Sequence, residues 1–238
     1  LAFGAVIGGI VGSVFGPQVA LLTDAVTFLI AGGLLMTIRV GDPVTAPVYD
    51  ETETDDRSFQ EALRYLRRNP SRTGNLFVKG AGSLGNMDTI LTFYATSVFI
   101  LGADGELSLG ILFGAFGLGA LVGPFLFNRF HGGTVIGLRR MVWVGFVLNA
   151  LGWFAFGAAP LLWLAAFAIG FRAMGASANW VYSTTLIQKT VPDAYLGRAF
   201  SLDMAGFYLA SVLSTVVHGV LIDLYGAEHI QAIVYWTG

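Results

Sequence analysis

Long apolar segments separated by short polar ones run along the whole chain. A transmembrane helix needs about 20 mostly apolar residues, and segments near that length recur throughout the sequence. They lie at 1–14, 18–38, 76–101, 108–130, 141–159, 161–187 and 199–221, and residues 230–238 begin a further one. Several connections are tight, as expected between antiparallel helices. The pattern predicts an all-α membrane protein made of packed helices.

The polar segment at residues 39–75 is the longest interruption of this pattern. Residues 40–57 are rich in Asp and Glu and contain two prolines, so we expect a flexible, solvated loop. The loop divides the chain into residues 1–38, which we interpret as the last two helices of a first bundle, and residues 76–238, a second bundle.

A basic amphipathic helix is predicted at residues 58–69. Ser58 and Glu61 have the spacing of a capping box. Apolar residues then recur at i, i+3, i+4 and i+7, and the arginines fall largely on the opposite side. We expect this helix at a membrane surface or against cytoplasmic helix ends; a soluble linker helix is the alternative.

The basic residues are distributed asymmetrically. All but one of the 13 Lys and Arg residues lie in or beside alternate polar gaps. They are Arg39, Arg57, Arg64, Arg67, Arg68, Arg72 and Lys79, then Arg129, Arg139 and Arg140, then Lys189 and Arg198. The intervening gaps hold Asp104, Glu106, Asp223 and Glu228. By the positive-inside rule, the basic gaps and the loop at 39–75 face the cytoplasm.

Composition excludes several functional classes. Hydrophobic residues make up 55% and charged residues 12%, whereas soluble domains contain about a quarter charged residues. The net charge of -2 gives no reason to expect a nucleic-acid partner. The absence of cysteine removes disulfides and thiolate chemistry. Because the chain begins with Leu1 and both ends fall in apolar segments, we expect a fragment of a longer protein.

No sequence motif supports an enzyme, a cofactor or a metal site. Residues 80–85 match G-x-G-x-x-G, but they begin a membrane span rather than follow a strand, so we interpret them as a helix-packing surface. The three histidines show no metal-ligand spacing. His218, within a span, is a candidate proton relay, although a packed polar contact is the favoured interpretation.

Two charged residues are predicted deep in the membrane. Arg172 lies roughly 16 Å into its span at 1.5 Å per residue, and Asp88 lies about as deep in the span 76–101. A buried charge requires a partner or a watery cavity. Other polar candidates accompany them on the same two spans, namely Asn179 and Ser183 near Arg172, and Asn86 and Thr92 near Asp88. The alternative is that Arg172 only bonds backbone or neighbouring helix ends.

Three short motifs resemble those of the major facilitator superfamily. The first contains Gly4, Gly8 and Gly9, and is similar to the antiporter motif of the fifth helix. The second contains Gly123, Asn128, Arg129, Arg139 and Arg140, and resembles the loop between helices eight and nine. The third contains Asp193, Gly197 and Arg198, and is similar to the turn after helix ten in the macrolide-efflux and enterobactin-exporter-like branch. The resemblance assigns the spans to helices five to eleven and the start of twelve.

The sequence departs from these motifs at two positions. Ala5 replaces a proline that shapes the fifth helix, which weakens the inference of proton antiport. Asn128 replaces an acid, which removes a carboxylate that pairs with the basic loop residues. The glycines and arginines of the motifs are retained.

The resemblance implies a secondary transporter of a bacterial inner membrane, working by alternating access. It further implies an exporter of amphipathic small molecules of the drug or siderophore type, with Asp88 and Arg172 on cavity-lining helices and proton coupling through Asp88. The expected partners are the lipid bilayer, the substrate, protons and an N-terminal bundle of the same protein. An importer of the same fold and a transport-inactive membrane sensor or scaffold are the alternatives.

Overall fold

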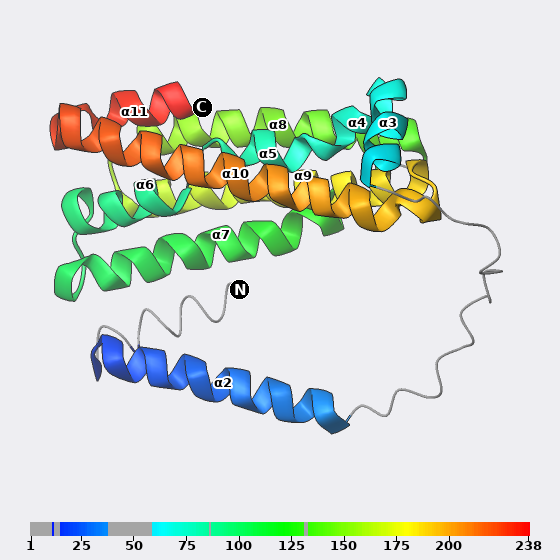
Figure 1. Cartoon of the computed structure of the whole chain (residues 1–238). Helices are drawn as coiled ribbons and strands as arrows, with labels where there is room; N and C mark the ends of the chain where they lie inside the picture. The colour runs from blue at the N-terminus through cyan, green and yellow to red at the C-terminus, as the bar shows by residue number, and fades with distance from the viewer. Residues whose placement is uncertain (1–10, 12–14, 38–58, 86, 131–132) are drawn as a thin grey trace.

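The computed structural model describes residues 11, 15–37, 59–85, 87–130 and 133–238. These residues form helices and no strand, which confirms the predicted all-α class (Figure 1). The helices are α2 (Pro17–Thr37), α3 (Phe59–Arg68), α4 (Pro70–Leu76), α5 (Val78–Ser83), α6 (Met87–Phe93), α7 (Glu106–Phe127), α8 (Val135–Gly157), α9 (Leu162–Thr190), α10 (Asp193–Tyr225) and α11 (Ile230–Thr237). A π-helical turn (Tyr94–Val98) follows α6, and short 3₁₀ turns precede α7 and α11.

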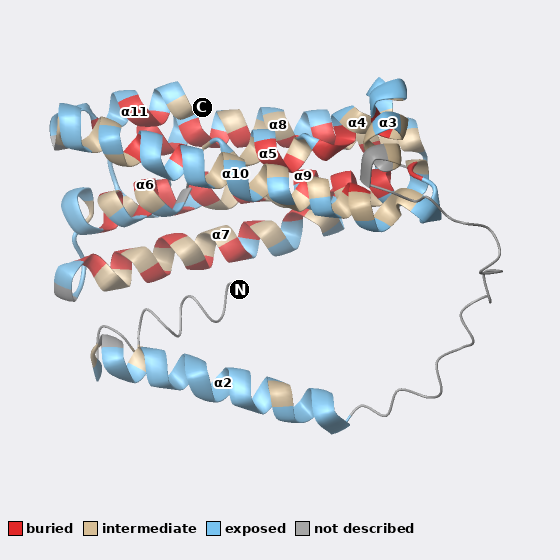
Figure 2. Cartoon of the chain, in the orientation of Figure 1, coloured by how far each residue is buried: buried red, intermediate tan, exposed pale blue. Residues whose placement is uncertain are grey.

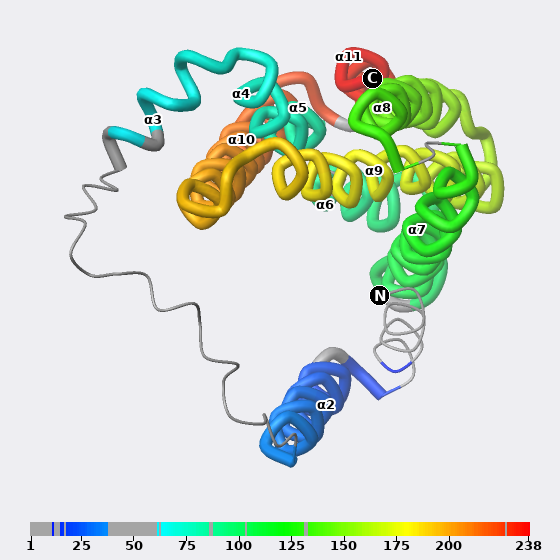
Figure 3. Tube along the Cα trace, turned by 90° about the vertical axis from the view of Figure 1, so that its right-hand side faces the viewer, coloured from blue at the N-terminus to red at the C-terminus, as the bar shows by residue number. Residues whose placement is uncertain are grey.

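Helix α9 is the centre of the bundle, with α7 and α8 packed along it and α5 and α10 beside it (Figure 3). Glycines make the close approach possible. A Cβ on Gly119 would collide with the carbonyl oxygen of Gly170, and one on Gly152 would lie 2.7 Å from the Cα of Arg172. The helix backbones of α7, α8 and α9 therefore pack closely at these glycines, since small residues allow helices to approach.

Four of the described helices are long and apolar enough to cross a membrane. They are Gln18–Thr37, Glu106–Phe127, Val135–Gly157 and Asp193–Tyr225. Helix α9 is also long enough, at 29 residues, but it is more polar and much of it is buried between its neighbours. The predicted span 161–187 therefore corresponds to the most protein-enclosed helix. The predicted span 1–14 lies almost entirely outside the described residues.

The prediction of one continuous span at 76–101 is wrong. The chain there forms α5, then a break that begins at Leu84, then α6 and the π-helical turn. Partners from α10 support the break, because the Ser214 hydroxyl donates to the Leu84 carbonyl and the Ser83 hydroxyl lies 3.2 Å from the Phe207 carbonyl. Gly85 fits against Trp153 and Thr237, where a Cβ would lie 3.0 and 2.9 Å from their side chains. Broken helices occur in membrane proteins where other groups satisfy the freed backbone.

The amphipathic segment 58–69 forms α3, which packs against helix ends. Leu66 is buried with residues of α4, α9 and α10, and the Tyr65 ring stacks on Tyr195 at 4.9 Å. The sequence pattern predicts this helix either at a membrane surface or against helix ends, and in the structure it packs against helix ends. Pro70 begins a further helix, α4, that the sequence reasoning missed.

The outer faces of the bundle expose large apolar side chains, which include Phe125, Trp143 and Phe167. Helix α2 lies apart from the bundle in Figure 1, and none of the residues in its membrane-length window is buried (Figure 2). Exposed apolar surface of this extent indicates contact with protein or lipid. Buried residues concentrate on the faces that the helices turn toward one another (Figure 2).

The basic and acidic turns lie at opposite ends of the bundle. The start of α8, the end of α9 and the start of α10 meet α3 and α4 at one end (Figure 1). There the Lys189 ammonium donates to the Gly133 carbonyl at 2.7 Å, and Arg139 donates to the Ser71 carbonyl at 3.1 Å. The start of α7 and the end of α10, with Glu106 and Glu228, lie at the other end. The compartment that each end faces stays a prediction.

Candidate functional site

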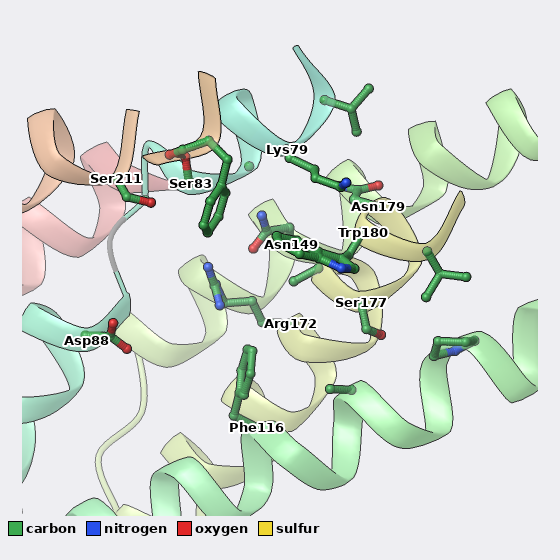
Figure 4. A pocket seen from close by; sticks show the side chains of 18 residues that line it. Lys79, Ser83, Asp88, Phe116, Asn149, Arg172, Ser177, Asn179, Trp180 and Ser211 are labelled. Carbon is green, nitrogen blue, oxygen red and sulfur yellow. Dashed lines mark hydrogen bonds between the residues drawn. The ribbon is translucent and has the colours of Figure 1, made fainter. Parts of the chain in front are cut away.

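A cavity of about 450 Å³ opens between the middle segments of α5, α7, α8, α9 and α10 (Figure 4). Its wall is mixed in character. The aromatic part comes from Phe116, Trp180 and Phe207, and the charged part comes from Lys79, Asp88 and Arg172. Serine and asparagine side chains complete the polar part of the wall. A cavity of this size with a few convergent polar groups is the usual form of a small-molecule site.

Arg172 projects from the middle of α9 into this cavity (Figure 4). The residue is 3% exposed, and its guanidinium carbon lies 4.3 Å from the centroid of the Trp153 ring. A cation over an indole face gains a cation–π attraction that is stronger where water is excluded. Gly152 on α8 leaves room for the backbone of Arg172 to approach.

Asp88 lines the same cavity from the first turn of α6. The residue is exposed, and its charge acts electrostatically on Arg172. Figure 4 shows the two side chains at different sides of the cavity. The direct ion pairs in the described part of the chain include Lys79 with Asp203 but not Asp88 with Arg172. The structure thus brings the two predicted residues to one cavity, and their direct pairing stays a prediction.

Two asparagines contribute buried amide groups to the wall. Asn179 on α9 is 4% exposed and Asn149 on α8 is 9% exposed. Within the described residues, both amide atoms of Asn179 and the Oδ1 of Asn149 have no hydrogen-bond partner. Asn179 was predicted from its spacing to Arg172. Asn149 was missed, although a lone asparagine in an otherwise apolar span was an available signal.

Lys79 and Asp203 form a buried ion pair that the sequence did not predict. Their Nζ and Oδ2 atoms are 2.5 Å apart, and the side chains are 2% and 0% exposed. The ammonium also lies 4.7 Å from the Trp180 ring centroid. The sequence pattern grouped Lys79 with the basic residues beside the loop at 39–75. That grouping is wrong in structural terms, because Lys79 faces inward from α5 and lines the cavity.

The remaining polar candidates are distributed differently. Ser183 is fully buried, and its hydroxyl donates to the Trp180 carbonyl of its own helix. Thr92 is exposed, and its carbonyl accepts a bond from Thr96. Neither residue is among those that line the cavity. Asn86 lies outside the described residues.

His218 is held by hydrogen bonds at both ring nitrogens. Its Nδ1 lies 2.7 Å from the Ser214 carbonyl, and its Nε2 lies 2.8 Å from the Thr237 hydroxyl. The residue is 1% exposed and joins α10 to α11. This arrangement agrees with the packed polar contact that the sequence favoured over a proton relay.

None of the described motif residues lines the cavity. One of them, Gly123, lies in the contact between α7 and α9. Gly123 is buried, and a Cβ there would lie 2.7 Å from the Cα of Met174 on α9. The others lie near the basic end of the bundle, where Asn128 caps the end of α7 and Arg139 bonds α4. Arg129 and Arg140 are exposed, Asp193 and Gly197 lie at the exposed start of α10, and Arg198 is half-buried. Gly4, Gly8 and Gly9 lie outside the described residues.

A bundle of membrane-length helices around a polar cavity is an architecture found in membrane transport proteins. The family model of the Major Facilitator Superfamily matches residues 1–135 and 83–238, which together cover the chain. The chain therefore belongs to this superfamily of secondary transporters and is a multi-pass membrane protein. No curated protein and no solved structure matches the sequence.

Proposed function

We propose that this protein exports amphipathic small molecules, of the drug or siderophore type, across a bacterial inner membrane. The main support for this proposal is the mixed wall of the cavity of about 450 Å³, in which aromatic rings and charged groups face the same space. Trp180 and Phe207 contact each other edge to face at 5.1 Å, and Arg172 lies among the polar groups. Rings accept the apolar part of an amphipathic molecule, and the charged groups accept its polar part.

The proposed mechanism is alternating access. The cavity lies midway along the long helices, and a second bundle supplies its other half in this proposal. Helix α2 belongs to that bundle, and we propose that preceding helices outside this sequence complete it. Rocking of the two bundles about the site exposes it to each side of the membrane in turn. The predicted cytoplasmic end is the one that gathers Arg139 and Lys189.

Proton coupling through Asp88 is part of the proposal. An exposed carboxylate in the cavity can exchange a proton with water, and protonation would remove the charge that acts on Arg172. The loss of that attraction changes the relative energies of two conformations, which is what coupling requires. The family motifs have a proline and an acid where this chain has Ala5 and Asn128. The support for proton coupling therefore comes from Asp88 and not from these motifs.

An efflux screen tests the function. Cells with and without the full-length protein are loaded with a panel of drugs and siderophores, and the retained amount of each compound is measured. We expect lower retention of at least one amphipathic compound in cells that express the protein, and loss of that effect in the Asp88→Asn, Arg172→Gln double variant. Thr92→Val, outside the cavity, is the matched control and should retain efflux.

The same screen separates the alternatives. Higher retention in expressing cells would identify an importer. Unchanged retention of every compound, together with an altered transcriptional response to one of them, would identify a membrane sensor or scaffold. Efflux that persists in the double variant would remove Asp88 and Arg172 from the coupling mechanism.

A further inference from the structure

Three arginines form an exposed basic face on α3. Arg64, Arg67 and Arg68 are exposed, and their spacing of three and four residues places them on one side of the helix. Leu66, which points away from Arg64 and Arg68, is buried. Glu61 is the only acid of α3 against the three arginines. None of these arginines has an ion-pair or hydrogen-bond partner among the described residues.

Helix α3 lies at the ends of the membrane-spanning helices. Its Leu66 is buried in one cluster with Ile187 and Val191, at the end of α9, and with Ala199 of α10. The predicted apolar spans end at residue 187 and begin again at residue 199. The contacts of α3 therefore fall where the hydrocarbon of a bilayer gives way to its headgroups. In Figures 1 and 3, α3 runs across the direction of the long helices, as a helix in the plane of the interface does.

Several contacts hold the basic face in place. The Tyr65 ring stacks on Tyr195 of α10 at 4.9 Å, and the guanidinium carbon of Arg72 lies 5.4 Å from the Tyr65 ring centroid. The Thr73 hydroxyl donates to the Leu66 carbonyl at 2.5 Å, which ties the end of α3 to α4. A helix that is already folded and docked loses little conformational freedom when it binds a partner. The exposed arginines are thus presented from a fixed position.

We propose that Arg64, Arg67 and Arg68 bind the phosphate groups of anionic phospholipids in the surrounding bilayer. The planar guanidinium donates two parallel hydrogen bonds to phosphate oxygens. Basic residues on an amphipathic helix at an anionic membrane surface strengthen binding by about fivefold each. A lipid bound here joins the bilayer to the ends of α9 and α10. Such binding is independent of the substrate and of the direction of transport, so it goes beyond the proposed transport function.

Lipid binding to the full-length protein tests this surface. The protein in detergent is titrated with dioleoylphosphatidylglycerol, which is anionic, and with dioleoylphosphatidylcholine, which has the same acyl chains and no net charge. Native mass spectrometry measures the dissociation constant of the first bound lipid. We expect the wild-type protein to bind the anionic lipid at least about tenfold more tightly. Replacement of the three α3 arginines by glutamine should reduce this preference to about twofold or less.

Two matched triple variants make the result specific. Arg129→Gln, Arg140→Gln, Lys189→Gln removes the same number of exposed charges near the basic end of the bundle, and it should keep the preference for the anionic lipid. Replacement of the three α3 arginines by lysine retains their charge and should keep most of the preference. The lysine variant thereby separates the loss of charge from a disturbance of α3 itself.

Three results would overturn the lipid surface directly. They are equal affinity of the wild type for the two lipids, an unchanged preference in the glutamine variant of α3, and an equal loss in the control triple variant. A lysine variant that loses the preference as fully as the glutamine variant would reject recognition by charge. Displacement of the lipid by inorganic phosphate at the same concentration would identify a site for soluble anions instead.

The acidic segment before α3 is the competing occupant of the basic face. Residues 50–56 include five Asp and Glu residues. A preference for the anionic lipid that appears only after these five are changed to Asn and Gln would assign the arginines to the chain itself and overturn the proposal. The transport function fails separately, because a protein that exports no compound in the cellular screen but prefers the anionic lipid would keep this surface and reject the exporter.

Discussion

Lys79 and Asp203, 124 residues apart in the sequence, form a fully buried ion pair that joins α5 to α10 at the cavity wall. The Trp180 ring covers the ammonium at 4.7 Å. Membrane interiors tolerate charged side chains when these pair within the protein. The pair therefore fixes the start of the broken helix α5–α6 against α10, and through Trp180 it also reaches the central helix α9.

We predict that Lys79→Met destabilises the protein by about 3–5 kcal/mol, because it leaves the Asp203 carboxylate buried without its counter-charge. The Lys79→Met, Asp203→Leu double variant should recover most of this loss, since two apolar side chains can replace a buried pair. Unfolding in detergent measures both values. Lys189→Met, an exposed lysine, is the control and should change stability little. A double variant less stable than the single one would contradict the pairing.

The glycines of α7 give a second prediction. Gly119→Ala should cost about 1–3 kcal/mol, because its Cβ would collide with the Gly170 carbonyl of α9. Gly197→Ala, at the open start of α10, has nothing within 4 Å of the new Cβ. It should be neutral or slightly stabilising, since alanine is the better helix former. Thermal unfolding of both variants tests the contact, and equal effects at the two positions would argue against close α7–α9 packing.

A third prediction concerns the hydrogen bonds of His218. His218→Ala should lower the stability by about 1–3 kcal/mol, because it leaves the buried Ser214 and the half-buried Thr237 with fewer bonds. His229→Ala, at an exposed turn, should have a much smaller effect. If His218 instead relays protons, the substitution would change the pH dependence of efflux at unchanged stability, so both quantities are measured on the same variants.

The sequence pattern predicts the long helices because length and apolarity decide membrane spans. The expected spans 108–130 and 18–38 correspond to α7 (Glu106–Phe127) and α2 (Pro17–Thr37). The break after α5 was not predictable, because the groups that support it, Ser214 and Phe207 of α10, come from a distant segment. Local composition indicates only that residues 80–85 are small, and not that a helix ends there.

Part of the candidate site was predictable from the spacing of polar residues along a single helix. Arg172 and Asn179 lie two turns apart on one helix, so local spacing places them on one face. The buried position of Lys79 was not predictable from the sequence, because its partner Asp203 is brought to it only by the packing of α5 on α10. Ser183 shared the polar face in sequence, but its hydroxyl is satisfied within its own helix. Periodicity indicates a face, and the packing of neighbours decides which part of that face lines the cavity.

The opposite distribution of basic and acidic turns predicts the orientation of the protein. The chain contains no cysteine, so a single introduced cysteine is the only thiol that it presents. Glu228→Cys lies at the exposed acidic end, and Gly197→Cys lies at the exposed basic end. A membrane-impermeant maleimide should label Glu228→Cys in intact cells and Gly197→Cys only after permeabilisation, because basic turns remain in the cytoplasm. The unsubstituted chain is the control for background labelling, and the reverse labelling pattern would invert the predicted orientation.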